Sequence, residues 1–163
     1  MELVGVRVEV PANTPVVILR EQVGQQRLLP IVIGTPEAQS IHAALEGIES
    51  PRPLTHDLMV QMLARLQTEL TRIVVTEIRD HVFFAELHLV TAGREQILSS
   101  RPSDAIALAV RTGSPIFATE GLLLQAGQQP VEDDAEDDDE EAIIDEFLEF
   151  LDDLDPDDFK GGG

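Results

Sequence analysis

The sequence contains no cysteine, tryptophan or tyrosine, and six phenylalanines are its only large aromatic residues. Without cysteine, disulfide bonds, thiolate zinc sites and a cysteine nucleophile are excluded. The core must therefore be built from aliphatic side chains. No apolar run reaches the roughly 20 residues of a membrane-spanning helix, and the N-terminus lacks the basic and apolar regions of a signal peptide. We therefore expect a cytoplasmic protein with no membrane partner.

Basic residues are also scarce: 11 lysines and arginines stand against 31 aspartates and glutamates, a net charge of −20. Residues 1–130 carry 14 acidic and 10 basic side chains, a net charge of −4. Residues 131–163 carry 17 acidic side chains and one lysine, a net charge of −16. The body therefore has no overall positive field to attract nucleic-acid phosphates, and only a local basic patch would bind them.

Hydrophobic periodicity predicts one domain over residues 1–130. The expected fold is a single compact α+β domain with a mixed, mostly antiparallel sheet, two similar intertwined halves and packed helices. The predicted strands are 2–10, 16–21, 27–33, 72–79, 82–90, 94–99 and 115–118, and the predicted helices lie between 35 and 47 and over 56–70, 102–112 and 119–125. Residues 27–33 are apolar on both faces, which predicts a central strand, although Pro30 favours an edge or a bulge.

A weak internal repeat relates residues 16–47 to residues 82–113. Each unit contains two strands, then a proline and an acidic residue, then a helix that ends at a glycine. In this repeat Glu37 corresponds to Asp104. Both carboxylates fall in the first turn of their helices, where the helix dipole favours negative charge.

The acidic C-terminal region is predicted to have three parts. Residues 131–141 are too charged to fold alone and are expected to be a disordered linker. Residues 142–155 have an amphipathic helical pattern, with acidic residues opposite an apolar stripe. This helix needs a partner surface, from the body, a neighbouring subunit or another protein. Residues 156–163 are expected to be a flexible end.

The segment Arg-Pro-Ser-Asp at residues 101–104 has two interpretations. As structure, Pro102 starts a helix and Asp104 caps its first turn. As function, the helix N-terminus binds an anion, Arg101 adds a bidentate phosphate donor, and Asp104 holds a divalent metal or orients a water. Helix capping explains the proline and the aspartate but leaves Arg101 without a role.

The stretch SRPSDAIALAVRTGSPIF, residues 100–117, resembles the signature of the bifunctional nuclease (BFN, DNase/RNase) domain family. LPIxIG at 29–34, PEAxxI at 36–41 and THDL at 55–58 resemble the same family, and the resemblance covers roughly residues 1–128. It implies a compact α+β domain built on a duplicated unit, a homodimer and a bacterial cytoplasmic setting. It also implies hydrolysis of DNA and RNA phosphodiester bonds.

Three functional hypotheses follow. The first is a nuclease that acts on single-stranded RNA or DNA, with Arg101, Ser103 and Asp104 as catalytic residues. Asp104 and Glu37 would then bind Mg²⁺ or Mn²⁺. The second is a non-enzymatic oligomeric regulatory protein whose acidic tail binds a basic partner. The third is autoinhibition, in which the tail mimics nucleic acid and occupies the body.

Two further pairs of residues are candidates with a stronger structural explanation. His56 and Asp57 follow Thr55 at the start of a predicted helix, where Asp57 suits the first turn. Glu86 and His88 share one face of a predicted strand and have the spacing to bind a metal together. We expect the first pair to support the helix and the second to lie on a solvated face.

Overall fold

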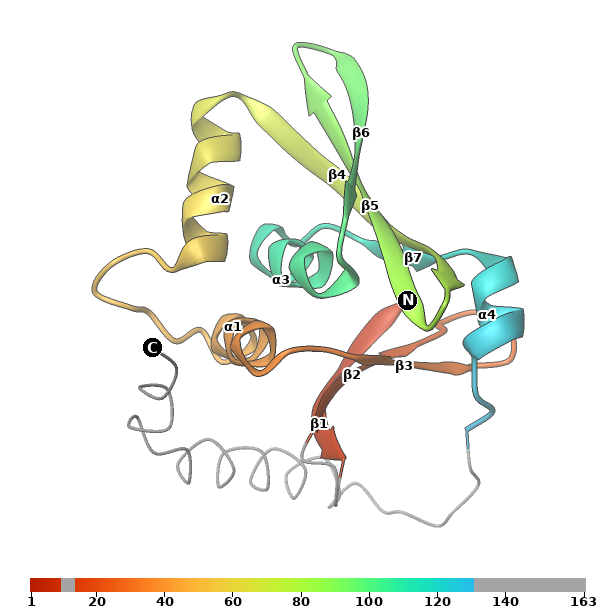
Figure 1. Ribbon diagram of the computed structural model, residues 1–163. Helices are drawn as coiled ribbons and strands as arrows, with labels where there is room; N and C mark the ends of the chain where they lie inside the picture. The colour runs from red at the N-terminus through yellow and green to blue at the C-terminus, as the bar shows by residue number, and fades with distance from the viewer. Residues whose placement is uncertain (10–13, 131–163) are drawn as a thin grey trace.

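The computed structural model describes residues 1–9 and 14–130 (Figure 1). In chain order the elements are β1 (Glu2–Glu9), β2 (Thr14–Arg20), β3 (Leu28–Val32), α1 (Thr35–Leu45), α2 (Thr55–Arg65), β4 (Thr68–Arg79), β5 (Val82–Thr91), β6 (Arg94–Ser100), α3 (Pro102–Thr112), β7 (Ile116–Ala118) and α4 (Glu120–Ala126). This confirms the α+β class. The predicted linker 131–141, helix 142–155 and end 156–163 lie outside the described residues. None of the described helices is long and apolar enough to cross a membrane.

The strands form two separate sheets. The first has the order β1-β2-β3 and is antiparallel, and the second has the order β6-β5-β4-β7, with only β7 parallel to its neighbour. The prediction of a central strand over 27–33 is wrong, because β3 lies at an edge of its sheet. Val32 is exposed, so β3 does not bury both of its faces. The edge position agrees with Pro30, which has no backbone N–H to donate to a neighbouring strand.

The two repeat units are both present. In one, the antiparallel pair β2–β3 leads into α1, and in the other the antiparallel pair β5–β6 leads into α3. Helices α1 and α3 pack against each other. The duplication therefore brings two equivalent helix N-termini into one region of the molecule.

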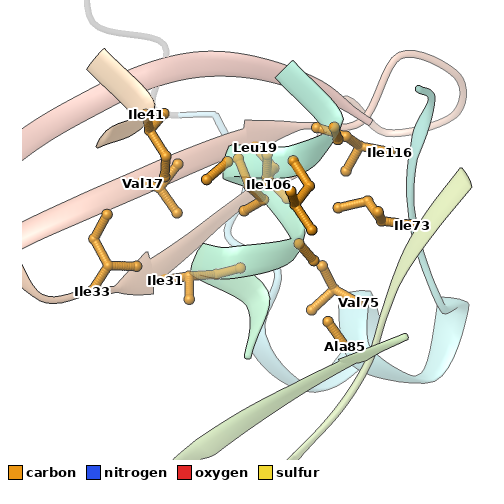
Figure 2. Close-up of a cluster of buried hydrophobic side chains, with 14 of the residues drawn as sticks. Val17, Leu19, Ile31, Ile33, Ile41, Ile73, Val75, Ala85, Ile106 and Ile116 are labelled. Atoms are coloured by element: carbon orange, nitrogen blue, oxygen red, sulfur yellow. The ribbon is translucent and has the colours of Figure 1, made fainter. Parts of the chain in front are cut away.

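Helix α3 lies at the centre of the core. It begins directly after Arg101, with Pro102 as its first residue, and ends at Gly113, whose φ of 68° is the left-handed conformation that glycine adopts readily. Five consecutive side chains in its middle, residues 105–109, are buried. Figure 2 shows Ile106 among side chains from both sheets, including Leu19 and Val75. A helix buried on all sides is positioned by packing, so its N-terminus is held firmly.

Helix α2 is shorter than predicted and much less buried. The expected helix over 56–70 ends at Arg65, and Gln67 has a left-handed φ of 54° that stops it. Leu70 fits the helical period of the sequence, but it lies in β4, where it is buried. His56 is the one buried residue of α2. The exposed apolar side chains on and beside this helix are Leu54, Leu58, Met59, Met62 and Leu66.

The central position of Ile106 predicts a large cost for its truncation. Ile106 is 0% exposed, so we expect Ile106→Ala to lower the free energy of unfolding by about 2–5 kcal/mol. Ile48→Ala, at a side chain that is 61% exposed, is the matched control and should change it by less than about 0.5 kcal/mol. Urea unfolding followed by circular dichroism measures both, and equal losses would contradict the core described here.

Candidate functional site

The N-termini of α1 and α3 meet at the guanidinium of Arg101. Glu37 and Asp104 are each the third residue of their helix. Arg101 donates from Nε to Asp104 Oδ2 at 2.8 Å, and from Nη2 to Asp104 Oδ1 at 2.9 Å and to Glu37 Oε1 at 2.8 Å. The structure thus brings together three of the four residues that the sequence indicated. It also shows that Arg101 pairs with both carboxylates of the repeat.

Asp104 is also bound by His56, which comes from the first turn of α2. His56 Nε2 lies 3.2 Å from Asp104 Oδ1, and His56 Nδ1 lies 2.8 Å from the hydroxyl of Ser40 in α1. The histidine is buried, with 7% of its surface exposed. A continuous hydrogen-bonded chain therefore runs from Ser40 through His56 and Asp104 to Arg101.

The sequence analysis did not identify Ser40, and it interpreted His56 as support for the start of a helix. Ser40 follows Glu37 by three residues, so both lie on one face of α1. His56 belongs to the THDL segment that contributed to the family resemblance. Neither signal shows that the start of α2 packs against the start of α3, because the two segments are 48 residues apart in sequence.

The charges at this site stabilise one another. Burial of Asp104 opposes its ionisation, but hydrogen bonds from Arg101 and His56 outweigh burial and hold the pKa of Asp104 below its usual value. Hydrogen bonds to Asp104 and Glu37 raise the pKa of Arg101. Near neutral pH, Asp104 is therefore an anion that accepts hydrogen bonds and Arg101 is a cation.

An open pocket of about 790 Å³ exposes this network. We call it the Arg101 pocket, and its polar wall is formed by Glu37, Ser40, His56, Arg101 and Asp104. Its volume is in the range of small-molecule sites, roughly 300–1,000 Å³. The Arg101 side chain is 64% exposed, so the guanidinium remains accessible to a ligand.

Ser103, the remaining predicted catalytic residue, does not line the Arg101 pocket. It is 6% exposed and lines a second, smaller pocket of about 310 Å³ together with Gly34 and Phe83. Arg101 lines both pockets. Ser103 therefore lies beside the network of charged residues without joining it.

The arrangement does not fit a divalent metal held by Glu37 and Asp104. Carboxylate oxygens suit Mg²⁺ or Mn²⁺, but Arg101 bonds both oxygens of Asp104 and one oxygen of Glu37. Within residues 1–9 and 14–130 no group of three or more His, Asp or Glu side chains is placed to hold a metal ion. The guanidinium supplies the positive charge between the two carboxylates.

The other candidates have structural partners outside the Arg101 pocket. Asp57 accepts from Arg111 Nε at 2.6 Å and from the backbone N–H of Leu54 at 2.9 Å, so it ties the start of α2 to the end of α3. On the second sheet, His88 Nε2 lies 3.4 Å from Glu86 Oε2, and Arg72 Nη2 donates a hydrogen bond to His88 Nδ1 at 3.0 Å. Unlike His56, these three residues, Asp57, Glu86 and His88, do not line the Arg101 pocket.

A sequence profile of the bifunctional nuclease domain matches residues 17–130, which include every residue of the Arg101 pocket. The chain belongs to this family. The match ends where the acidic region begins, so residues 131–163 are an addition to the bifunctional nuclease domain.

Relatives are found in bacteria and in plants. An uncharacterized protein of Mycobacterium tuberculosis is 41% identical over 164 residues, which cover 98% of this chain and 97% of the relative. Bifunctional nuclease 1 of Arabidopsis thaliana is 29% identical over 124 residues, and Bifunctional nuclease 2 of Oryza sativa subsp. japonica is 30% identical over 124 residues. These two matches cover 74% of this chain but 38% of each plant protein. The mycobacterial match therefore extends into the acidic region, and the plant matches stay close to the domain.

The partners of Asp57 predict a stability that depends on pH. The hydrogen bond from Arg111 lowers the pKa of Asp57 despite partial burial, whereas an unfolded aspartate titrates near about 3.9. The unfolded chain therefore binds the proton more readily, so this stabilisation is complete above the unfolded value and is lost as the pH falls through the folded one. The urea midpoint of Asp57→Asn should lie below that of the wild type at pH 7, and this gap should shrink at pH 3.

The exposed Asp80 supplies the control for this measurement. Asp80→Asn makes the same chemical change on the turn between β4 and β5, and it should leave the urea midpoint at pH 7 nearly unchanged. A gap for Asp57→Asn that is as large at pH 3 as at pH 7 would contradict the role of its charge.

Proposed function

We propose that this chain is a nuclease that hydrolyses phosphodiester bonds of DNA or RNA in the Arg101 pocket. Membership of the bifunctional nuclease family and the names of the plant relatives support this class of reaction. One observation carries the assignment to this pocket. An accessible arginine shares an ionised aspartate with a buried histidine, which places a phosphate-binding group next to a proton acceptor.

Arg101 is suited to bind the phosphate. No described residue accepts a hydrogen bond from its Nη1, so one end of the guanidinium is free to donate to non-bridging phosphate oxygens. Arginine presents its donors in a planar fork, of which Nε and Nη2 are held here by the two carboxylates, so Nη1 is left to donate to the phosphate. Because Glu37 and Asp104 already hold the fork, little reorganisation is needed as negative charge develops in the transition state.

His56 is suited to move a proton. The ionised Asp104 only accepts hydrogen bonds, so His56 Nε2 donates to it. In the neutral ring Nδ1 then keeps a lone pair, and this lone pair faces the hydroxyl of Ser40 at the Arg101 pocket. General base catalysis by a positioned histidine contributes about 10²–10⁴-fold to a rate.

The nuclease proposal predicts that Arg101 is needed for cleavage. With fluorescent single-stranded RNA and DNA, we expect Arg101→Ala to lower kcat/KM by at least about 10²–10³-fold, because it removes the donors that stabilise the transition state. Arg101→Lys keeps the charge without the fork and should fall between Arg101→Ala and the wild type. Arg94→Ala, at the exposed arginine that begins β6, is the control and should retain activity.

Each protein is assayed with Mg²⁺, with Mn²⁺ and with EDTA. That cleavage depends on one of these ions stays a prediction from the sequence, because in the described site Arg101 lies between the two carboxylates that were expected to bind the metal. Cleavage by Arg101→Ala at the wild-type rate in every condition would contradict the proposed site. Absence of cleavage by the wild type in all of them would contradict the proposed function.

The exposed apolar face of α2 favours an oligomer. Apolar patches of this kind on soluble proteins mark interaction surfaces, and we propose that the face pairs with a second copy of the chain. Within the described part of the chain, the apolar side chains of this face remain exposed to solvent. Binding of a basic partner by the acidic region, and autoinhibition by that region, stay predictions because residues 131–163 lie outside the described part of the chain.

Pairing through α2 predicts that a charge on its apolar face weakens the dimer. We expect sedimentation equilibrium to give a dimer for the wild type and a shift toward monomer for Met62→Glu. Gln61→Glu adds the same charge at the neighbouring exposed position and is the control. A monomeric wild type, or equal association of both variants, would contradict pairing through this face.

A further inference from the structure

Ser40, His56 and Asp104 form a connected series from three different helices. The Ser40 hydroxyl lies 2.8 Å from His56 Nδ1, and His56 Nε2 lies 3.2 Å from Asp104 Oδ1. A hydroxyl, an imidazole and a partly buried carboxylate in this order are the components of an activated serine nucleophile. All three side chains line the Arg101 pocket.

The direction of the hydrogen bonds agrees with activation of Ser40. Arg101 holds Asp104 ionised, so the carboxylate accepts the hydrogen of His56 Nε2. This tautomer, assigned from the network of partners, leaves the lone pair of Nδ1 directed at Ser40. The serine hydroxyl then donates to the histidine, which is the arrangement that removes its proton during attack.

Ser40 is also close to the phosphate-binding group. It lies one helical turn after Glu37, whose carboxylate binds Arg101. Arg101 and His56 both donate to the same oxygen of Asp104, Oδ1. Arg101 and Ser40 both line the Arg101 pocket, so a phosphate that binds Arg101 in this pocket would share it with the Ser40 hydroxyl.

We propose that Ser40 is the nucleophile of this site and forms a covalent phosphoseryl intermediate. This proposal rests on the proposed nuclease function, so the substrate is a phosphodiester. Ser40 Oγ attacks phosphorus while its proton passes to His56 Nδ1. The bond from phosphorus to the leaving ester oxygen then breaks, and that oxygen takes the proton from Nδ1. In the second step water attacks phosphorus and gives a proton to Nδ1, the bond to Ser40 Oγ breaks, and Ser40 recovers its proton.

A first test measures activation at position 40 without any nucleic acid. Because the chain has no cysteine, Ser40→Cys creates a single thiol, and iodoacetamide reports how readily it ionises. We expect this thiol to be alkylated more than tenfold faster at neutral pH than that of Gln39→Cys, which lines the same pocket on the neighbouring residue of α1. The advantage should disappear in Ser40→Cys with His56→Gln. Equal rates for the two single cysteines would overturn the proposal.

A second test uses the chromogenic diester bis(p-nitrophenyl) phosphate. The full chain should release a burst of p-nitrophenol equal to the enzyme concentration, and an acid quench should leave a phosphoryl adduct on the peptide that contains Ser40. Ser40→Ala, His56→Gln and the double variant should lose activity to the same level, because members of one catalytic unit are not additive. Full activity of Ser40→Ala would show that the serine only orients His56.

The two proposals fail in different ways. Cleavage of RNA or DNA that survives Ser40→Ala, with no burst and no adduct, would overturn the nucleophile and leave the nuclease. A reactive Ser40→Cys thiol in a chain that cleaves neither RNA nor DNA would leave an activated serine and overturn the nuclease.

Discussion

One guanidinium organises the candidate site. Arg101 joins the N-termini of two helices, and it lies 64 positions from its partner Glu37 in sequence. The side chain is largely exposed, and exposed ion pairs contribute only about 0–1 kcal/mol to stability. Its main effect is therefore geometric: it holds Glu37 and Asp104 on either side of one guanidinium and keeps Asp104 ionised. The direction of the hydrogen bond from His56, and with it the free lone pair that faces Ser40, depends on that charge.

The scaffold beneath the site is more deeply buried than the site itself. Helix α3 is buried on nearly every side and carries Arg101 and Asp104 at its start. Helix α2 contributes one buried residue, His56, and is tied to α3 through Asp57 and Arg111. The same short segment thus anchors an otherwise exposed helix and supplies the histidine that we propose as the proton acceptor. Changes to α2 are therefore coupled to the site.

Much of the fold follows from sequence pattern. The order of strands and helices, the Pro102 start and the Gly113 end of α3, and the repeat that equates Glu37 with Asp104 were all predicted. The failures have a common cause. Residues 27–33 and 56–70 were assigned by counting apolar residues, but which apolar residues become buried depends on neighbours from distant segments. Val32 and most of the apolar residues of α2 lie exposed, and Leu70 fits a helical period while lying in a strand.

The sequence by itself determined the family, through its motifs, and the α+β class, through its periodicity. It also indicated three residues of the candidate site, because local rules of capping and repetition place Arg101, Asp104 and Glu37 at helix starts. Only the tertiary structure showed that these starts converge, that Arg101 lies between the two carboxylates, and that Ser40 and His56 complete the hydrogen-bonded chain. It also separated Ser103 from that chain. Local pattern specifies which backbone groups and side chains are available, whereas the packing of α1, α2 and α3 around one core decides which of them lie within hydrogen-bond distance.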